Sequence, residues 1–177
     1  MRNAGITHII CVRQEQEAKF IRENMPQSFT YLTVDIADTP CENIIRFFPG
    51  VSASLSLADY NQVPAQICNY IADCLEKGGK VLVHGNGGIS RSAALVIAYV
   101  MQSQLYSASD ALKFVQNKRF CVYPNEGFRR QLFEYEPILR ASVTAARRGL
   151  RPAASVNPKR GIQDVDGDDD WQERRRI

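Results

Sequence analysis

The segment Lys80–Met101, KVLVHGNGGISRSAALVIAYVM, constrains the fold more than any other part of the 177-residue chain. The Val-Leu-Val run within Lys80–His84 is typical of a buried strand. Ala93–Ala98 is apolar nearly all round, which indicates a buried helix beginning near Arg91. Glycines between the two allow a sharp turn, because glycine reaches positive φ at little steric cost. The segment therefore predicts a strand, a tight loop and a helix.

A loop of this kind is suited to binding an anion. Its backbone N–H groups can converge on one point, and the following helix directs its positive end there. Arg91 can donate bidentate hydrogen bonds to phosphate oxygens. The alternative is that the loop is only a tight turn and that Arg91 pairs with a surface carboxylate. The loop does not match two common nucleotide-binding motifs. Walker A requires Gly-Lys-Ser/Thr where this loop has Ser90-Arg91-Ser92, and the dinucleotide fingerprint requires a third glycine where Ser90 stands. The predicted phosphate-binding residues are Gly85, Asn86, Gly87, Gly88, Ile89, Ser90 and Arg91.

The loop resembles the His-Cys-x5-Arg-Ser/Thr signature of the protein tyrosine phosphatase superfamily at His84, Arg91 and Ser92, but Gly85 stands at the cysteine position. In that family the cysteine thiolate is the nucleophile that takes the phosphoryl group. Glycine has no side chain to form this bond, whereas the N–H groups and Arg91 need no thiolate to hold phosphate. The resemblance therefore implies a pseudophosphatase, not an enzyme.

The resemblance covers most of Asn3–Glu136 and is closest to a catalytically inactive group of dual-specificity phosphatases, in the blocks DIADTPCENIIRFFP, HGNGGISRSAALVIAY and RRFCVYPNEGF. It implies an α/β fold of three layers, with a central mixed sheet flanked by helices. It also implies that His84, Ser92 and Asn125 support the loop. Asp38 matches the aspartate that protonates the leaving group in active relatives, and is expected to be a vestigial acid. The alternative is that Asp38 simply stabilises a turn.

Periodicity and capping signals predict the remaining elements. The expected strands are Thr7–Val12 and Phe29–Asp35. A surface helix is expected at Gln14–Asn24, a short amphipathic turn at Glu42–Phe48 and a further helix at Val63–Lys77. After the central helix we expect a helix at Ala108–Asn117, capped by Ser107 or Ser109, and a long last helix that begins at Pro124–Phe128. Lys118 and Arg119 are interpreted as a solvated basic face near the expected ligand.

The chain is expected to form one phosphatase-like domain, residues 1–146, followed by a disordered charged tail at 147–177. Val51–Gln62, rich in Ser, Gly and Ala, departs from the family and is interpreted as an insertion. The start is abrupt, because Asn3–Thr7 is typical of a helix end and the family carries a strand region and a helix before it. We therefore expect the domain to be truncated at its N-terminus.

Composition narrows the function classes. A net charge of +3 is too small to argue for nucleic-acid binding. No apolar stretch is long enough to span a bilayer and no signal peptide is recognisable, so a soluble intracellular protein is expected. The cysteines are widely spaced without a Cys-x-x-Cys pair, which favours neither a disulfide framework nor a zinc site; they are Cys11, Cys41, Cys68, Cys74 and Cys121. No metal or cofactor is expected.

The sequence thus predicts a non-catalytic module that binds phosphorylated serine, threonine or tyrosine. The family resemblance adds mitogen-activated protein kinases and F-box subunits of ubiquitin ligases as partners, a location in nucleus and cytoplasm, and a monomer. Two alternatives stay open: a weak phosphatase that uses water with Asp38, and a phosphate-independent scaffold in which Arg91 is structural. Gly85 argues against the first alternative, but nothing in the sequence excludes the second.

Overall fold

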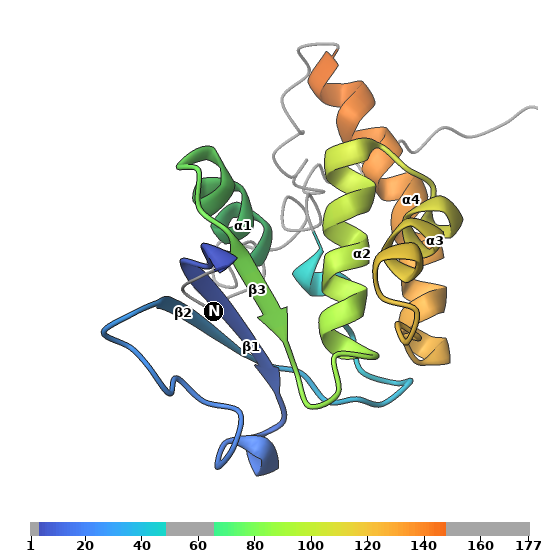
Figure 1. Cartoon of the computed structure of the whole chain (residues 1–177). Helices are drawn as coiled ribbons and strands as arrows, with labels where there is room; N and C mark the ends of the chain where they lie inside the picture. The colour runs from blue at the N-terminus through green and yellow to red at the C-terminus, as the bar shows by residue number, and fades with distance from the viewer. Residues whose placement is uncertain (1–3, 49–65, 148–177) are drawn as a thin grey trace, which may run out of the picture.

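The computed structural model describes residues 4–48 and 66–147, coloured along the chain in Figure 1. In chain order the elements are β1 (His8–Arg13), η2 (Glu15–Glu17), β2 (Thr30–Asp35), η3 (Ile45–Phe47), α1 (Gln66–Glu76), β3 (Val81–His84), α2 (Arg91–Gln104), α3 (Ala108–Lys118) and α4 (Glu126–Arg147). The predicted insertion and the start of the predicted helix Val63–Lys77 lie outside the described residues. The predicted tail 147–177 lies outside them as well except for Arg147, which is the last residue of α4.

The strands form a parallel sheet in the order β2-β1-β3. β1 lies in the centre, with His8 opposite Thr30 on one side and Val81 on the other. The family resemblance implied a mixed sheet, but within the described residues every pairing is parallel. Long crossovers account for this, because parallel neighbours cannot be joined by a tight hairpin: 14–29 joins β1 to β2, and 36–80 joins β2 to β3.

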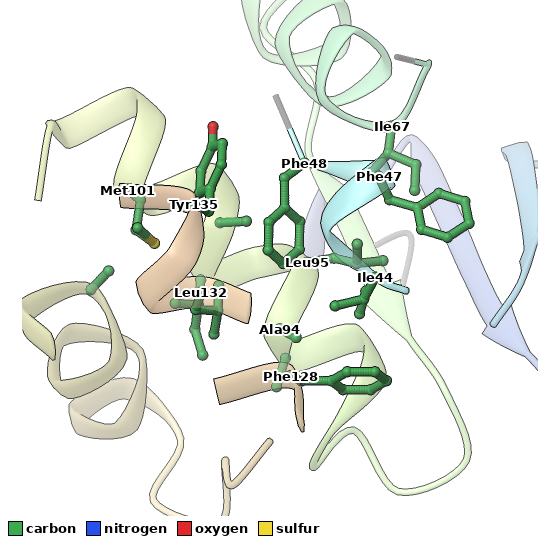
Figure 2. Packing of buried hydrophobic residues seen from close by; sticks show 14 of the residues in the cluster. Ile44, Phe47, Phe48, Ile67, Ala94, Leu95, Met101, Phe128, Leu132 and Tyr135 are labelled. Carbon is green, nitrogen blue, oxygen red and sulfur yellow. The ribbon is translucent and has the colours of Figure 1, made fainter. Parts of the chain in front are cut away.

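Successive side chains of β1 point to opposite faces of the sheet and so build two cores. Ile10 and Val12 join the larger core, which also takes side chains from η3 and the four helices. Figure 2 shows the centre of this core, where Phe48 packs edge-on against Tyr135 at 5.2 Å between ring centroids. Ile9 and Cys11 join a smaller core on the other face, covered by the 14–29 connection.

The predicted surface helix at Gln14–Asn24 is wrong, since only the short 3-10 turn η2 forms there. Glu17 accepts the backbone N–H of Gln14 at 2.7 Å, which closes the turn. The chain then bends so that Ile21 is buried in the smaller core, and its carbonyl accepts a hydrogen bond from Arg13. One buried apolar residue cannot hold a longer amphipathic helix against the sheet.

The other predicted elements form close to their expected bounds. Ser107 caps α3 by accepting the N–H of Asp110 at 3.1 Å, which selects it over Ser109. α4 begins at Glu126 because the side chain of Asn125 accepts the N–H of Phe128 at 2.9 Å. Within the two described ranges, none of the helices combines the length and the hydrophobicity needed to cross a membrane.

The segment that carries Asp38 packs tightly on the start of α4. The carbonyl of Pro40 occupies the place where a side chain on Gly127 would begin. A few residues on, Gln131 accepts the N–H groups of Ile44 and Ile45 at 2.9 and 3.0 Å. Only glycine at position 127 permits this approach, so it fixes how the segment lies against the helix.

We expect Gly127→Ala to destabilise the fold by about 2 kcal/mol or more, because a methyl group there must displace backbone. Urea unfolding at neutral pH measures the change. Arg130→Ala, at an exposed position of the same helix, is the matched control and should shift the free energy of unfolding by less than about 0.5 kcal/mol. Equal stability of the two variants would contradict the packing described here.

Candidate functional site

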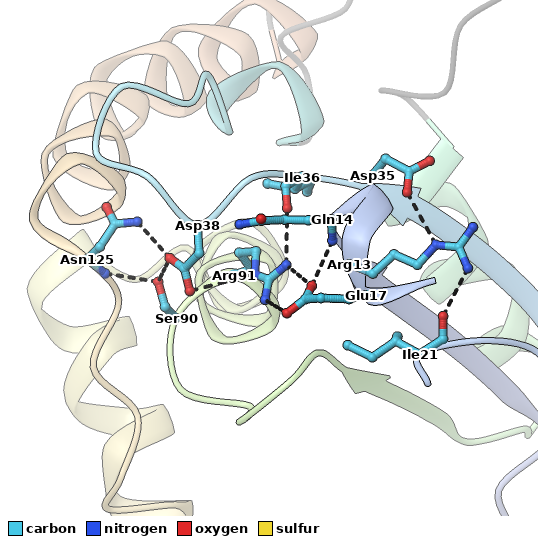
Figure 3. A network of polar contacts seen from close by, with 10 residues as sticks. All are labelled: Arg13, Gln14, Glu17, Ile21, Asp35, Ile36, Asp38, Ser90, Arg91 and Asn125. Carbon is cyan, nitrogen blue, oxygen red and sulfur yellow. Dashed lines mark hydrogen bonds and ion pairs between the residues drawn. The ribbon is translucent and has the colours of Figure 1, made fainter. Parts of the chain in front are cut away.

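The candidate site lies at the carboxyl edge of the sheet, where the segments that follow β1, β2 and β3 meet (Figure 3). Open parallel sheets bind ligands at this edge. A hollow of about 420 Å³ opens here, lined by Asp38 together with Gly85, Asn86, Gly87, Gly88, Ile89, Ser90, Arg91 and Ser92. The structure thus gathers all the predicted phosphate-binding residues around one space, with Asp38 beside them.

The loop runs from the end of β3 at His84 to the start of α2 at Arg91. Gly88 has a φ of 67°, a conformation that side chains other than glycine rarely adopt. From outside, the backbone N–H of Tyr123 donates to the carbonyl of Ile89 at 3.0 Å. Because α2 begins where the loop ends, the positive end of the helix lies at the hollow.

Arg91 is only 6% exposed and lies at the centre of the polar network in Figure 3, between Asp38 and Glu17. Its Nη1 donates to Glu17 Oε2 at 2.6 Å and to the carbonyl of Ile36 at 3.2 Å, and its Nη2 donates to Glu17 Oε1 at 2.9 Å. A guanidinium has five N–H donors. These three bonds therefore leave one N–H of Nη2 and the N–H of Nε for a ligand, with Asp38 3.6 Å from Nε.

Glu17 is the site residue that sequence reasoning missed. Its side chain is 13% exposed, and it neutralises the buried guanidinium of Arg91 in a two-bond pair. The hydrogen bonds from Arg91 are the main cause that lowers the pKa of Glu17 to about 2, and the same pair raises the pKa of Arg91. Its one local signal is the spacing Gln14-x-x-Glu17, typical of a capping box, which says nothing about a distant arginine.

Asp38 lies over the edge of the loop and accepts several hydrogen bonds. Its Oδ1 accepts from the Ser90 hydroxyl at 2.7 Å and from the Asn125 amide at 2.9 Å. The backbone N–H of Asn125 also donates to Ser90 Oγ at 3.1 Å. Asn125 therefore supports both the loop and Asp38, and the Asp38 side chain is 34% exposed.

Gly85, which the family resemblance equates with the nucleophilic cysteine, leaves little room above its backbone. A Cβ there would lie 3.0 Å from the carbonyl oxygen of Val12 and 3.7 Å from Ser92 Oγ. His84 Nε2 lies 3.2 Å from the sulfur of Cys11, on the neighbouring strand. Burial raises the pKa of this thiol, which makes Cys11 a poor nucleophile. Of the cysteines that the structure describes, none lines the hollow.

Arg119 contacts the loop but does not line the hollow that contains Arg91. Its Nη2 donates to the carbonyl of Gly87 at 3.2 Å and lies 3.4 Å from where a Cβ on Gly88 would be. From the sequence, Arg119 was interpreted as part of a solvated basic face near the expected phosphate ligand. The structure adds a direct contact with the loop itself.

The comparisons with known proteins agree with this geometry. The model of the family "Dual specificity phosphatase, catalytic domain" matches residues 58–138. Serine/threonine/tyrosine-interacting protein A of Xenopus laevis is 51% identical over 143 residues, which are 81% of this chain and 57% of that protein. The human serine/threonine/tyrosine-interacting protein is 51% identical over 144 residues, again 81% and 57%. The chain thus spans about 57% of the length of these curated relatives.

Solved structures show the same similarity. The crystal structure of the human tyrosine phosphatase-like serine/threonine/tyrosine-interacting protein matches with a TM-score of 0.67 and 51% identity, over 77% of this chain and 80% of that one. A mouse putative dual specificity phosphatase, complexed with zinc tungstate, matches with a TM-score of 0.64 and 28% identity, over 80% and 76%. The chain therefore belongs to the dual-specificity phosphatase family, among relatives of the serine/threonine/tyrosine-interacting proteins.

The pair between Glu17 and Arg91 predicts a specific dependence of stability on pH. The folded protein holds the pKa of Glu17 at about 2, below its ordinary value of 4.5. This contribution to stability is therefore fully present above about pH 4.5 and is lost as the pH falls towards 2. We expect it to amount to about 2–3 kcal/mol.

Urea unfolding from pH 2 to pH 7 tests this dependence in wild type, Glu17→Gln and Glu15→Gln. Glu17→Gln should be less stable at pH 7 and should lack the acid-dependent loss, because it has no carboxylate to protonate. Glu15 lies exposed on the same turn and serves as the control. Parallel stability curves for wild type and Glu17→Gln would contradict the assigned role.

Proposed function

We propose that this domain binds phosphorylated serine, threonine or tyrosine side chains on protein partners and holds them without hydrolysis. The observation that carries the proposal is the combination at one loop of a buried, oriented arginine and a glycine at the nucleophile position. Arg91 supplies directed N–H donors, and the loop and the start of α2 supply further ones. Gly85 supplies no atom that could form a phosphoenzyme.

A phosphate group entering the hollow meets Arg91 from the side. Glu17 occupies one flank of the guanidinium, which leaves Nε and one N–H of Nη2 as a pair of donors suited to two phosphate oxygens. Asp38 lies 3.6 Å from that Nε and repels a dianion. Phosphate binding therefore includes a displacement of the partly exposed Asp38 side chain, while the buried pair between Glu17 and Arg91 stays in place.

The proposed partners are phosphoproteins of signalling pathways, among them mitogen-activated protein kinases and F-box subunits of ubiquitin ligases, met in nucleus and cytoplasm. Support for protein binding comes from the similar proteins, which are named for interaction with serine, threonine and tyrosine. The 51% identity extends over 81% of this chain. Contacts with these partners can also use surfaces outside the hollow.

Two other functions each have one observation in their favour. Arg91 is already neutralised by Glu17, which favours a scaffold that binds partners without phosphate. Asp38 still lies over the loop, which favours a weak phosphatase that directs water at the phosphorus atom. Neither observation explains why the loop keeps the open hollow and unused donors that a phosphate requires.

Calorimetry with one peptide in phosphorylated and unphosphorylated form separates the proposal from the scaffold. Wild type should prefer the phosphorylated form by about tenfold or more, and Arg91→Lys should remove most of that preference, because lysine keeps the charge but not the fork. Arg140→Ala, at an exposed arginine of α4, is the matched control. Equal affinity of folded wild type for both peptides would establish the scaffold instead.

Restoring the nucleophile tests whether only the sulfur is missing. Gly85→Cys should hydrolyse p-nitrophenyl phosphate about a thousand-fold faster than wild type, since a thiolate at this position would face the loop donors. The new Cβ requires the carbonyl of Val12 to shift by a few tenths of an ångström. Gly85→Ser demands the same shift with a weaker nucleophile and is the control. A folded Gly85→Cys protein as inert as Gly85→Ser would show that more than the sulfur is absent.

A further inference from the structure

The acidic segment Asp164–Trp171, DVDGDDDW, is a feature of the chain that the proposed function does not use. It holds five aspartates and ends in the chain's one tryptophan, and it lies outside the described residues. A carboxylate accepts the same bidentate hydrogen bonds from arginine that phosphate oxygens accept. The acidic segment is therefore a chemical match for a hollow that can hold an anion.

The hollow lined by Arg91 offers hydrogen-bond donors to such a carboxylate. Three hydrogen bonds to Glu17 and Ile36 use one flank of the Arg91 guanidinium, and an N–H group remains on each of Nε and Nη2. Asp38 already lies 3.6 Å from Nε, so this side of Arg91 accepts a carboxylate. An aspartate carries one negative charge and a phosphate roughly two, so Asp38 repels an entering aspartate less.

Three side chains beside the hollow, Ile89, Tyr123 and Arg129, form a rim that suits an indole ring. Ile89 lines the hollow and is 45% exposed, and its carbonyl accepts the N–H of Tyr123 at 3.0 Å. The guanidinium carbon of Arg129 lies 4.7 Å from the centroid of the exposed Tyr123 ring. Arg129 Nε is buried without a hydrogen-bond partner in the part of the chain that the structure describes. Aromatic rings and guanidinium groups both stack favourably on tryptophan, so the rim can take Trp171.

The length of chain after α4 allows the acidic segment to reach this site. α4 begins beside the loop, where Asn125 contacts Asp38, and its 22 residues carry the chain about 33 Å away (Figure 1). Sixteen residues then separate Arg147 from Asp164, and a chain of that length can span up to about 55 Å. Tethering also gives the segment an effective concentration on the order of millimolar, so weak contacts are enough to occupy the site.

We propose that the acidic segment docks at this hollow in the free protein. One of its aspartates pairs with the remaining N–H groups of Arg91, and Trp171 packs on the rim. Any other anion that enters the hollow first displaces the segment, so the chain carries its own competitor for the site. This docking goes beyond the proposed function and does not depend on it, because it needs Arg91 and the rim but no phosphorylated ligand.

The fluorescence of Trp171 in the full chain tests docking directly, because no other residue of the chain is a tryptophan. The measured quantity is the rate constant with which acrylamide quenches this fluorescence. Trp171 should be protected from quenching in wild type and should lose this protection in a triple variant, Asp168→Asn with Asp169→Asn and Asp170→Asn. The matched control replaces Arg174–Arg176 by glutamine, which changes as many charges on the other side of Trp171 and should keep the protection.

Variants on the domain and a phosphorylated probe assign the docking to the hollow. Arg91→Lys and Ile89→Ser should each remove the protection of Trp171, because they remove the bidentate donor and the apolar part of the rim. Arg140→Ala, at an exposed arginine of α4, should keep it. The peptide Ala-Gly-phosphoserine-Gly-Ala should expose Trp171 on binding, and the triple variant should bind this peptide about tenfold more tightly than wild type.

The outcomes separate this inference from the proposed function. Quenching of wild type as fast as that of the triple variant overturns the inference, and so does protection that persists in both Arg91→Lys and Ile89→Ser. Protection that fades on dilution places the segment on a second copy and also overturns it. Equal affinity of wild type and triple variant for the phosphorylated peptide overturns it as well. If neither protein binds that peptide, the proposed function fails, and the protection of Trp171 alone decides the inference.

Discussion

The buried ion pair between Arg91 and Glu17 is the interaction on which the site depends. An arginine 6% exposed at the start of α2 is tolerable only if a carboxylate neutralises it, because an unpaired buried charge costs several kcal/mol. Glu17 comes from the connection after β1, and the carbonyl of Ile36, which also accepts from Arg91, comes directly after β2. One guanidinium therefore joins the segments that follow all three strands, and it belongs to the lining of the hollow between them.

The contacts of Asp38 with Ser90 and Asn125 are more exposed to solvent than the pair between Arg91 and Glu17. Asp38 is 34% exposed and links Ser90 of the loop to Asn125 at the start of α4. Hydrogen bonds near solvent exchange readily with water or a ligand, whereas a buried ion pair does not. The site thus has a fixed part, which orients Arg91, and an exchangeable part, which covers it. Gly127 ties the exchangeable part to α4 through the close approach of Pro40.

Local signals in the sequence were enough to predict the strand, loop and helix of Lys80–Met101 and a serine cap at Ser107 or Ser109, because each is decided by neighbours in the chain. The place of Asp38 near the loop came instead from the family resemblance. Glu17 could not be predicted, since its partner lies 74 residues away and its own segment has the composition of a surface helix. The strand order was equally hidden, because it depends on crossovers that no periodicity records. The mixed sheet, expected from the family resemblance, did not follow from the residues themselves.

The balance of charge explains what glycine at position 85 contributes. Around the hollow, one guanidinium faces two carboxylates, those of Glu17 and Asp38, before any ligand arrives. A cysteine thiolate at the same floor would add a third negative charge, which an active enzyme needs for chemistry but which opposes a bound dianion. With Gly85 that third charge is absent, so Glu17 and Asp38 are the carboxylates that the loop N–H groups and the positive end of α2 have to offset around a proposed phosphate ligand. Glycine at this position therefore fits the proposed binding without hydrolysis on both counts, because it lacks a nucleophile and adds no charge.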